Sequence, residues 1–231
     1  MELNDDRLIK SGPEATLVQK SPGELKSHWD NTYHKCPVEN LGWYEANPDP
    51  SLSMIEYCKL DKSASILNVG AGASTIIDVL LAQGFNNIIA NDISSIALKK
   101  LMTRLGEDTF KVKWIEDDLV NPVRLHKLGK IDVWHDRAVL HFFTEKKDQE
   151  SYFGLIKEMV KIGGHVIIAV FNLDGASKCS GLPVCRYSQE MLSSRLGDDF
   201  ELIQSFDYLY IMPSGNTRPY IYSLFKRKKE D

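Results

Sequence analysis

The sequence lacks any long apolar segment. No run of roughly eighteen apolar residues, the minimum for a helix that spans a bilayer, occurs within the 231 residues. The N-terminus begins with Glu2, Asp5 and Asp6, whereas a secretory signal has a basic stretch followed by an apolar one. The sequence therefore favours a soluble, cytoplasmic protein without a membrane partner.

Positive charge is also scarce. The 28 lysines and arginines are outnumbered by 32 aspartates and glutamates, which gives a net charge of -4 and a pI near 5.9. Domains that bind nucleic acid normally present an excess of positive charge. We therefore expect no nucleic-acid partner, and we expect the short basic cluster at 226–229 to be a solvated tail.

Cysteine is sparse, and the chain is long enough to bury a core without disulfides. The four cysteines are Cys36, Cys58, Cys179 and Cys185. His28, His34 and Cys36 lie close together, but no second pair follows at the spacing of a zinc site. The sequence predicts a reducing compartment and neither a disulfide framework nor a metal site.

The most informative stretch is a strand, a glycine turn and a helix in succession. An apolar run at 66–69 is followed by Gly70, Ala71 and Gly72, and a helix-like pattern begins at Ile76. Glycine permits positive φ, and its missing side chain lets a ligand lie against the backbone near the free N–H groups of the helix. We expect a nucleotide-like cofactor to bind here.

Acidic residues follow the next two predicted strands. Asp92 ends the second apolar run, about twenty residues after the glycine turn, where a carboxylate can accept both hydroxyls of a ribose. Asp118 follows the third predicted strand and is placed to accept from the amine of an adenine that lies against Ile93 and Leu119. Together these residues predict an adenosine-containing cofactor.

Strand-like and helix-like segments alternate from residue 66 onward. The predicted strands cover 66–69, 88–90, 112–115, 131–134, 165–171, 200–210 and 220–225. The alternation indicates a parallel sheet with helices on both faces, and the short turn at 213–216 requires the last two strands to pair antiparallel. We predict an α/β, Rossmann-like, mostly parallel seven-stranded sheet with an antiparallel C-terminal strand pair.

The N-terminal region divides into a leader and an aromatic segment. Residues 1–26 are polar and lack a sustained period, so we predict a flexible leader before a domain at 27–231. Trp29 and Tyr33 lie one turn apart in a helix predicted to begin near residue 24. Such a pair either anchors the helix to the domain or contacts a ligand, and both interpretations stay open.

Two further segments complete this part of the chain. The pair Trp43 and Tyr44 lies in an aromatic loop, and Ser51 is expected to cap a helix at 52–57. The long segment at 172–187 either covers the ligand or is a surface excursion.

The glycine turn, Asp92, Asp118 and the final strand pair together resemble the class I S-adenosylmethionine-dependent methyltransferases over residues 27–231. The segments 134–142 and 179–183 resemble a small single-domain branch that is similar to methyltransferases acting on protein lysines and on small molecules. The resemblance implies S-adenosylmethionine as the cofactor and either class of molecule as the acceptor. The predicted cofactor-binding residues are Trp29, Asn68, Gly70, Ala71, Gly72, Asp92, Ile93, Asp118 and Leu119.

Asn68 departs from the family pattern. An acidic residue is usual at this position, where it lies near the ammonium group of the cofactor. The amide of Asn68 accepts a hydrogen bond but carries no negative charge, so we expect a lower affinity for the cofactor. If the missing charge is the cause, Asn68→Asp should strengthen binding. Ser74 also stands where a third glycine is common.

Methyl transfer from a sulfonium is an in-line displacement that mainly requires alignment of the two reactants and exclusion of water. The resemblance places the methyl group near the tip of the fourth strand. There we predict His135 as a proton acceptor and Asp136 as the group that orients an amine or the methionine end. Alternatively, His135 supplies only its backbone carbonyl while Asp136 pairs with Arg137. The predicted substrate-binding residues are Tyr33, Trp43, Tyr44, Arg137 and Tyr187.

Two other functions share part of this pattern. A nicotinamide-dependent reductase would have the same first two strands, but Thr75 replaces the last glycine of its motif, and the catalytic tyrosine-lysine pair is absent from the predicted helices. A non-catalytic cofactor-binding module is favoured only by Asn68. The sequence does not indicate an oligomeric state.

Overall fold

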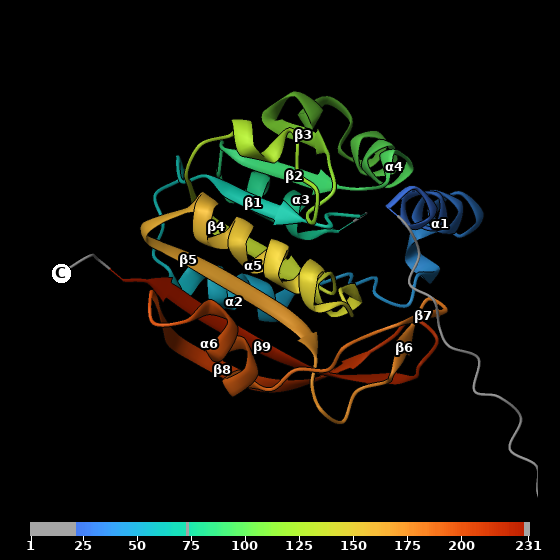
Figure 1. Ribbon diagram of the computed structural model, residues 1–231. Helices are drawn as coiled ribbons and strands as arrows, with labels where there is room; N and C mark the ends of the chain where they lie inside the picture. Colours follow the sequence, from blue (N-terminus) through green and yellow to red (C-terminus); the bar gives the residue numbers. More distant parts are fainter. Residues whose placement is uncertain (1–21, 73, 229–231) are drawn as a thin grey trace, which may run out of the picture.

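The computed structural model describes residues 22–72 and 74–228, and it is built around one seven-stranded sheet in the order β3-β2-β1-β4-β5-β9-β8 (Figure 1). The strands are β1 (Ile66–Val69), β2 (Ile88–Asp92), β3 (Val112–Glu116), β4 (Ile131–Arg137), β5 (Val160–Phe171), β8 (Phe200–Ile211) and β9 (Thr217–Arg227). The strands β1 to β5 pair in parallel, and β9 lies antiparallel between β5 and β8. This arrangement confirms the predicted fold class.

Helices cover both faces of the sheet (Figure 1). They are α1 (Pro22–Lys35), α2 (Asp49–Tyr57), α3 (Ile76–Ala82), α4 (Ser95–Leu105), α5 (Lys146–Met159) and α6 (Gln189–Leu196), with 3-10 helices η1 (Val38–Asn40), η2 (Gly106–Lys111), η3 (Leu125–Lys127) and η4 (Leu140–Phe142). The buried residues form one core with α5 and α6 and a second core with α2, α3 and α4. Alternation along β1 explains this division, because Leu67 and Val69 join the first core and Ile66 joins the second. Among the described helices, none is long and apolar enough to cross a membrane.

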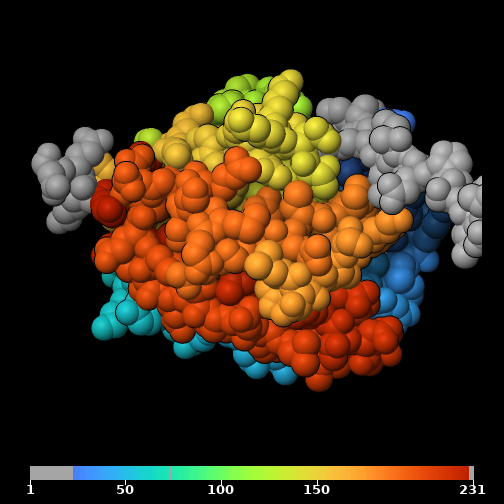
Figure 2. Space-filling view, turned by 60° about the horizontal axis from the view of Figure 1, so that its bottom comes forward, coloured from blue at the N-terminus to red at the C-terminus, as the bar shows by residue number. Residues whose placement is uncertain are grey.

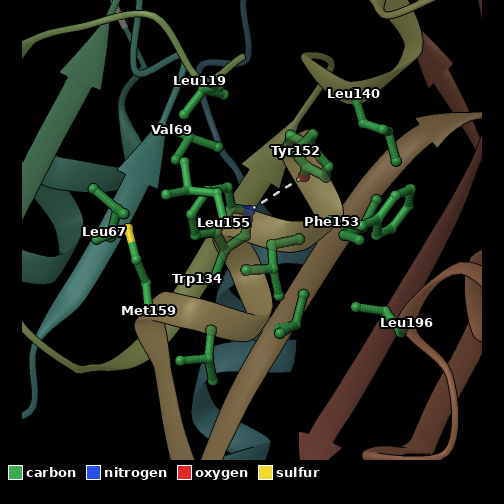
Figure 3. Close-up of a cluster of buried hydrophobic side chains, with 14 of the residues drawn as sticks. Leu67, Val69, Leu119, Trp134, Leu140, Tyr152, Phe153, Leu155, Met159 and Leu196 are labelled. Carbon is green, nitrogen blue, oxygen red and sulfur yellow. Dashed lines mark hydrogen bonds between the residues drawn. The ribbon is translucent and has the colours of Figure 1, made fainter. Parts of the chain in front are cut away.

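The core under α5 contains a buried polar contact. Trp134 of β4 and Tyr152 of α5 point toward each other between the apolar side chains Leu67, Leu155 and Met159 (Figure 3). The indole N–H of Trp134 donates to the hydroxyl oxygen of Tyr152 over 3.2 Å. The hydrogen bond satisfies the buried indole N–H.

The C-terminal part of the chain forms the face on the β8 side of the sheet. Figure 2 shows this face covered by segments coloured orange to red, which correspond to α6, β8 and β9. A small hairpin of β6 (Lys178–Cys179) and β7 (Leu182–Pro183) interrupts the segment between β5 and α6. The segment at 172–187 is therefore partly ordered as a hairpin.

Serine side chains near the starts of two helices have different roles. Ser94 caps α4, because its hydroxyl accepts from the N–H of Ala97. Ser51 does not cap α2, which begins two residues earlier at Asp49. Pro50 suits the first turn of a helix because it has no N–H to satisfy there, so Ser51 lies inside the helix and is buried.

Two predictions near the end of the sheet differ from the structure. The strand predicted at 165–171 begins earlier, at Val160. The helix α5 ends at Met159, and Gly163 lies within β5 at φ +77°, where an irregularity separates the pairing of Ile131 from that of Val133. Of the basic cluster at 226–229, which is predicted to be a solvated tail, Lys229 lies outside the described residues, while Lys226 and Arg227 belong to β9. Arg227 also donates to backbone carbonyls at the end of α5 and the start of β5.

Candidate active site

Two adjoining cavities lie at the carboxyl ends of the parallel strands. The main cavity is lined, among others, by Trp29, Tyr33, Trp43, Gly70, Asp92, Ile93, Asp118, Leu119, Arg137, Phe142 and Cys179. The turn cavity is lined, among others, by Trp43, Tyr44, Glu45, Asn68, Gly70, Ala71, Gly72, His135 and Arg137. All predicted cofactor-binding residues therefore line one of the two cavities. Trp43, Gly70 and Arg137 line both.

The turn after β1 requires glycine at positions 70 and 72. Gly70 and Gly72 have φ of +54° and +53°, values that residues other than glycine rarely adopt. A Cβ on Gly70 would lie 2.1 Å from a methyl carbon of Val139, and one on Gly72 would lie 2.3 Å from the hydroxyl oxygen of Tyr33. The absence of side chains lets α1 and the segment after β4 approach the turn.

Asp92 connects the turn to α4. One carboxylate oxygen accepts from the N–H of Gly72 and the other from the N–H of Ser94, each over 2.8 Å. Burial raises the pKa of Asp92 to about 6, although both backbone N–H groups oppose the shift. Each oxygen keeps a second lone pair, so the carboxylate can still accept from a ligand in the main cavity.

The two acids after β3 have different surroundings. Asp117 accepts from the backbone N–H groups of residues 123–125 and so organises the loop that follows. Asp118 accepts one N–H, from Val120, over 3.0 Å. Asp118 lines the main cavity together with Ile93 and Leu119, the apolar neighbours that the sequence predicts for an adenine.

Aromatic side chains close one end of the main cavity. The ring centroid of Trp29 lies 5.6 Å from that of Trp43 and 4.9 Å from that of Phe142, and both pairs pack edge to face. The indole N–H of Trp43 donates to the hydroxyl oxygen of Tyr33 over 3.1 Å. Trp29 and Tyr33 pack α1 onto the domain and also line the main cavity, where a ligand could reach them.

Helix α1 is tied to the rim of the cavity by polar contacts. Asp30 accepts from the Ser94 hydroxyl over 2.6 Å and from the Ile96 N–H over 3.4 Å. Lys26 forms ion pairs with Asp30 at 3.1 Å and with Glu116 at 2.9 Å. The helix begins at Pro22, so 22–26 of the predicted leader are helical and 1–21 lie outside the described residues.

The structure does not support His135 as a proton acceptor. The side chain is buried, and its Nδ1–H donates to the Asn68 amide oxygen while Nε2 accepts from the Ser51 hydroxyl, each over 2.9 Å. Burial and, to a lesser degree, Arg137 lower the pKa of His135 to about 3. The imidazole is neutral at physiological pH, and both of its nitrogens are already engaged.

The predicted roles of Asp136 are also not supported. Its carboxylate accepts from the N–H groups of Val139 and Leu140 and from the Tyr152 hydroxyl, at 2.9, 3.0 and 2.5 Å. Burial raises its pKa to about 6. Asp136 is absent from the described lining of both cavities, and it does not pair with Arg137. It fixes the turn after β4, in which Ala138 has φ +71°.

Arg137 lies where the two cavities meet. Its Nε pairs with Glu45 at 2.8 Å and donates to the Tyr222 hydroxyl at 3.0 Å, and Nη1 donates to the Trp43 carbonyl at 2.8 Å. Burial alone would lower its pKa, but the oxygens of Tyr222, Tyr220 and Glu45 raise the pKa overall. The guanidinium is therefore charged, and its Nη2 has no hydrogen-bond partner in the described part of the chain.

The structure separates one predicted residue from the site and adds another. Tyr187 is 2% exposed in the core beside α5, and it is outside the described lining of both cavities. Its predicted role in substrate binding is not supported. The sequence analysis missed Glu45, whose only signal is its position directly after the aromatic pair Trp43 and Tyr44.

Comparison with protein families finds one match. Residues 67–168 match the model of a methyltransferase domain. A search of curated proteins finds no relative of this chain. The family match agrees with the predicted methyltransferase relationship and the prediction of an enzyme, and a methyltransferase domain implies S-adenosylmethionine as the methyl donor.

Solved structures share the fold at low sequence identity. An S-adenosylmethionine-dependent methyltransferase from Anabaena variabilis is 14% identical, with a TM-score of 0.71 over 90% of this chain and 95% of that one. The 1,6-didemethyltoxoflavin-N1-methyltransferase from Burkholderia thailandensis is 18% identical, with a TM-score of 0.66 over 95% of this chain and 93% of that one. The N-methyltransferase NodS from Bradyrhizobium japonicum is 11% identical, with a TM-score of 0.63 over 87% of this chain and 100% of that one.

Proposed function

We propose that this chain, whose residues 67–168 match the model of a methyltransferase domain, transfers a methyl group from S-adenosylmethionine to a small-molecule acceptor. The observation that carries the proposal is the main cavity, in which Asp92, Asp118 and Gly70 of the glycine turn lie together. A small acceptor is favoured over a protein lysine because the similar Burkholderia thailandensis enzyme was solved with 1,6-didemethyltoxoflavin and S-adenosylhomocysteine bound.

The polar and apolar walls of the main cavity fit an adenosine group. The free lone pairs of Asp92 would accept the ribose hydroxyls without loss of its bonds to Gly72 and Ser94. Asp118 would accept from the exocyclic amine of the base. Ile93 and Leu119 would contact the faces of the base, as apolar side chains commonly do in ligand cavities.

When bound, the cofactor supplies an electrophilic methyl group on a sulfonium. The aromatic end of the cavity would exclude water from this group, and the rings of Trp29 and Trp43 can face a cation favourably. Neither His135 nor Asp136 is placed to remove a proton from the acceptor. We therefore propose that the acceptor atom arrives with a free lone pair and that the chain contributes alignment and desolvation.

The proposal is tested by measuring turnover. The purified full chain is incubated with S-adenosylmethionine and a panel of small amines, thiols, phenols and nitrogen heterocycles, and release of S-adenosylhomocysteine is measured. A lysine-rich peptide mixture forms a parallel arm. Release that depends on a small acceptor supports the proposal. Release with peptides alone would assign the acceptor to protein lysine, and silence throughout would favour a non-catalytic cofactor-binding module.

A further inference from the structure

A polar pocket lies at the opposite edge of the sheet from the two cavities, where the parallel strands begin. This edge is at the left of Figure 1, beside the end of β9. We call this pocket the amino-end pocket, and its lining includes Lys59, Asp61, Asp132, Lys161, His165 and Lys226. None of these residues lines the main cavity or the turn cavity. The pocket is therefore separate from the candidate active site.

Positive charge exceeds negative charge in the amino-end pocket. Its lining has three lysines and two aspartates. Lys161 forms an ion pair with Asp132, so these two charges cancel. Lys59 and Lys226 remain, against the exposed carboxylate of Asp61, and neither lysine side chain has a hydrogen-bond or ion-pair partner in the described part of the chain. The pocket therefore carries a net positive charge even when its histidine is neutral.

Two basic side chains lie directly opposite each other in this pocket. His165 of β5 pairs with Lys226 of β9 in the antiparallel register, so both side chains are on one face of the sheet. Glu201 of β8 lies opposite Lys226 on its other side, but no ion pair joins these two described residues. Burial and Lys226 lower the pKa of His165, although Asp132 opposes the shift. Like charges directly opposite destabilise a sheet, so an external anion would stabilise this pair once His165 is charged.

The two nitrogens of His165 differ in their access to solvent. Nδ1 is buried and has no hydrogen-bond partner among residues 22–72 and 74–228, whereas Nε2 is not buried. The ring therefore reaches the pocket through Nε2. A nearby anion favours the protonated imidazole, in which Nε2 donates a hydrogen bond, as the lysine ammonium groups do. The segment after α2, the strand β5 and the strand β9 thus each contribute one donor.

We propose that the amino-end pocket binds a phosphate group, with the side chains of Lys59, His165 and Lys226 donating to its oxygens. Phosphate carries up to two negative charges near neutral pH and offers several acceptor oxygens, so one group can accept from three elements at once. A carboxylate has only two oxygens and matches three donors less well. The inference stands apart from the proposed function, because the pocket shares no lining residue with either cavity.

The test follows His165 during a titration of the full chain. Histidine rings with an isotopic nitrogen label are observed by NMR near neutral pH, and the signal of His165 is identified by its loss in His165→Asn. Inorganic phosphate and glycerol phosphate are added in separate titrations, and sodium chloride at equal ionic strength is the reference. Lys226→Gln removes one donor. Lys99→Gln, at an exposed position on α4 outside the pocket, is the matched control.

We expect phosphate to shift the His165 signal saturably and to raise the pKa of His165, because an anion favours its charged form. Lys226→Gln should weaken phosphate binding about fivefold, through loss of one partly exposed charged hydrogen bond, whereas Lys99→Gln should bind as the wild type does. Saturation by inorganic phosphate alone would identify free phosphate as the ligand, and saturation by glycerol phosphate would identify a phosphate ester. An equal shift with phosphate and chloride, or equal weakening in both lysine variants, would overturn the inference and leave the proposed function untouched.

Discussion

The hydroxyl of Tyr33 occupies the space that a side chain on Gly72 would need. The Cβ of an alanine at position 72 would lie 2.3 Å from this oxygen, and the backbone there has φ +53°. Helix α1, which carries Tyr33, is thereby held close to the glycine turn. This contact makes the turn sensitive to substitution for two separable reasons, which are steric overlap and backbone strain.

We expect Gly72→Ala to lower the free energy of unfolding by about 1–3 kcal/mol from backbone strain, with a further loss from the clash. Gly84→Ala is the matched control, because Gly84 has φ +89° but open space around its Cβ position. Urea unfolding of both variants measures the difference. If Gly84→Ala costs as much as Gly72→Ala, close packing of Tyr33 against the turn is contradicted.

Asp92 is expected to contribute directly to ligand affinity. Asp92→Ala removes the acceptor for two ribose hydroxyls and should weaken the binding of S-adenosylhomocysteine by about 1–3 kcal/mol. Asp78→Ala, which breaks an exposed ion pair with Arg104, is the control and should leave affinity unchanged. An unchanged affinity in Asp92→Ala would mean that the ribose binds elsewhere.

The affinity should also depend on pH through Asp92. Its pKa is raised to about 6 in the free protein, so the carboxylate is partly protonated below that pH and accepts hydrogen bonds less well. We expect the affinity for S-adenosylhomocysteine to rise from about pH 5 to about pH 7 as this group ionises. Calorimetric titration across this range should show the rise, and Asp92→Asn should flatten it. The same rise in Asp92→Asn would assign the dependence to another group.

Tyr152 links two buried polar groups in the core under α5 (Figure 3). Its hydroxyl donates to Asp136 and accepts from the Trp134 indole N–H. Tyr152→Phe leaves both groups short of a partner and should lower the free energy of unfolding by about 1–3 kcal/mol. Tyr57→Phe, at a side chain that is 58% exposed, should change it little. Equal effects in urea unfolding would show that the buried network adds no stability.

His141 makes the fold sensitive to acid. Burial lowers its pKa from the ordinary 6.5 to about 3, and neither ring nitrogen has a described hydrogen-bond partner. Between these two values His141 is protonated in the unfolded chain but neutral in the folded chain. The free energy of unfolding therefore falls as the pH drops from 6.5 toward 3. His141→Phe should reduce this fall in unfolding experiments between those values. His34→Asn at an exposed position is the control, and an unchanged slope in His141→Phe would contradict the assignment.

The approximate positions of the strands and the antiparallel direction of the last pair follow from local sequence patterns, whereas their order in the sheet was not predicted. The apolar run at 166–171 in β5 is unbroken because both faces of this central strand are covered. The acids at strand ends are harder to assign from sequence. Asp92 and Asp118 line the main cavity, whereas Asp136 turns toward backbone N–H groups of the next turn. Sequence spacing cannot distinguish these directions, because the choice depends on the backbone after the strand.

Contacts between distant segments explain what the sequence analysis missed. Glu45 pairs with Arg137, which is far away along the chain, and His135 is held between Ser51 and Asn68 on other elements. No local pattern encodes such contacts. Tyr187 was assigned to the site because its segment follows β5, but its aromatic ring is better accommodated in the apolar core.

The central claim is that this site binds an S-adenosyl ligand, and ligand-dependent thermal stability tests it most directly. A ligand of the native state raises the melting temperature by mass action. We predict a rise for the full chain with S-adenosylmethionine and with S-adenosylhomocysteine, and none with oxidised or reduced nicotinamide dinucleotide. A rise with a nicotinamide dinucleotide alone would contradict the account and identify the strand, turn and helix as the site of a reductase.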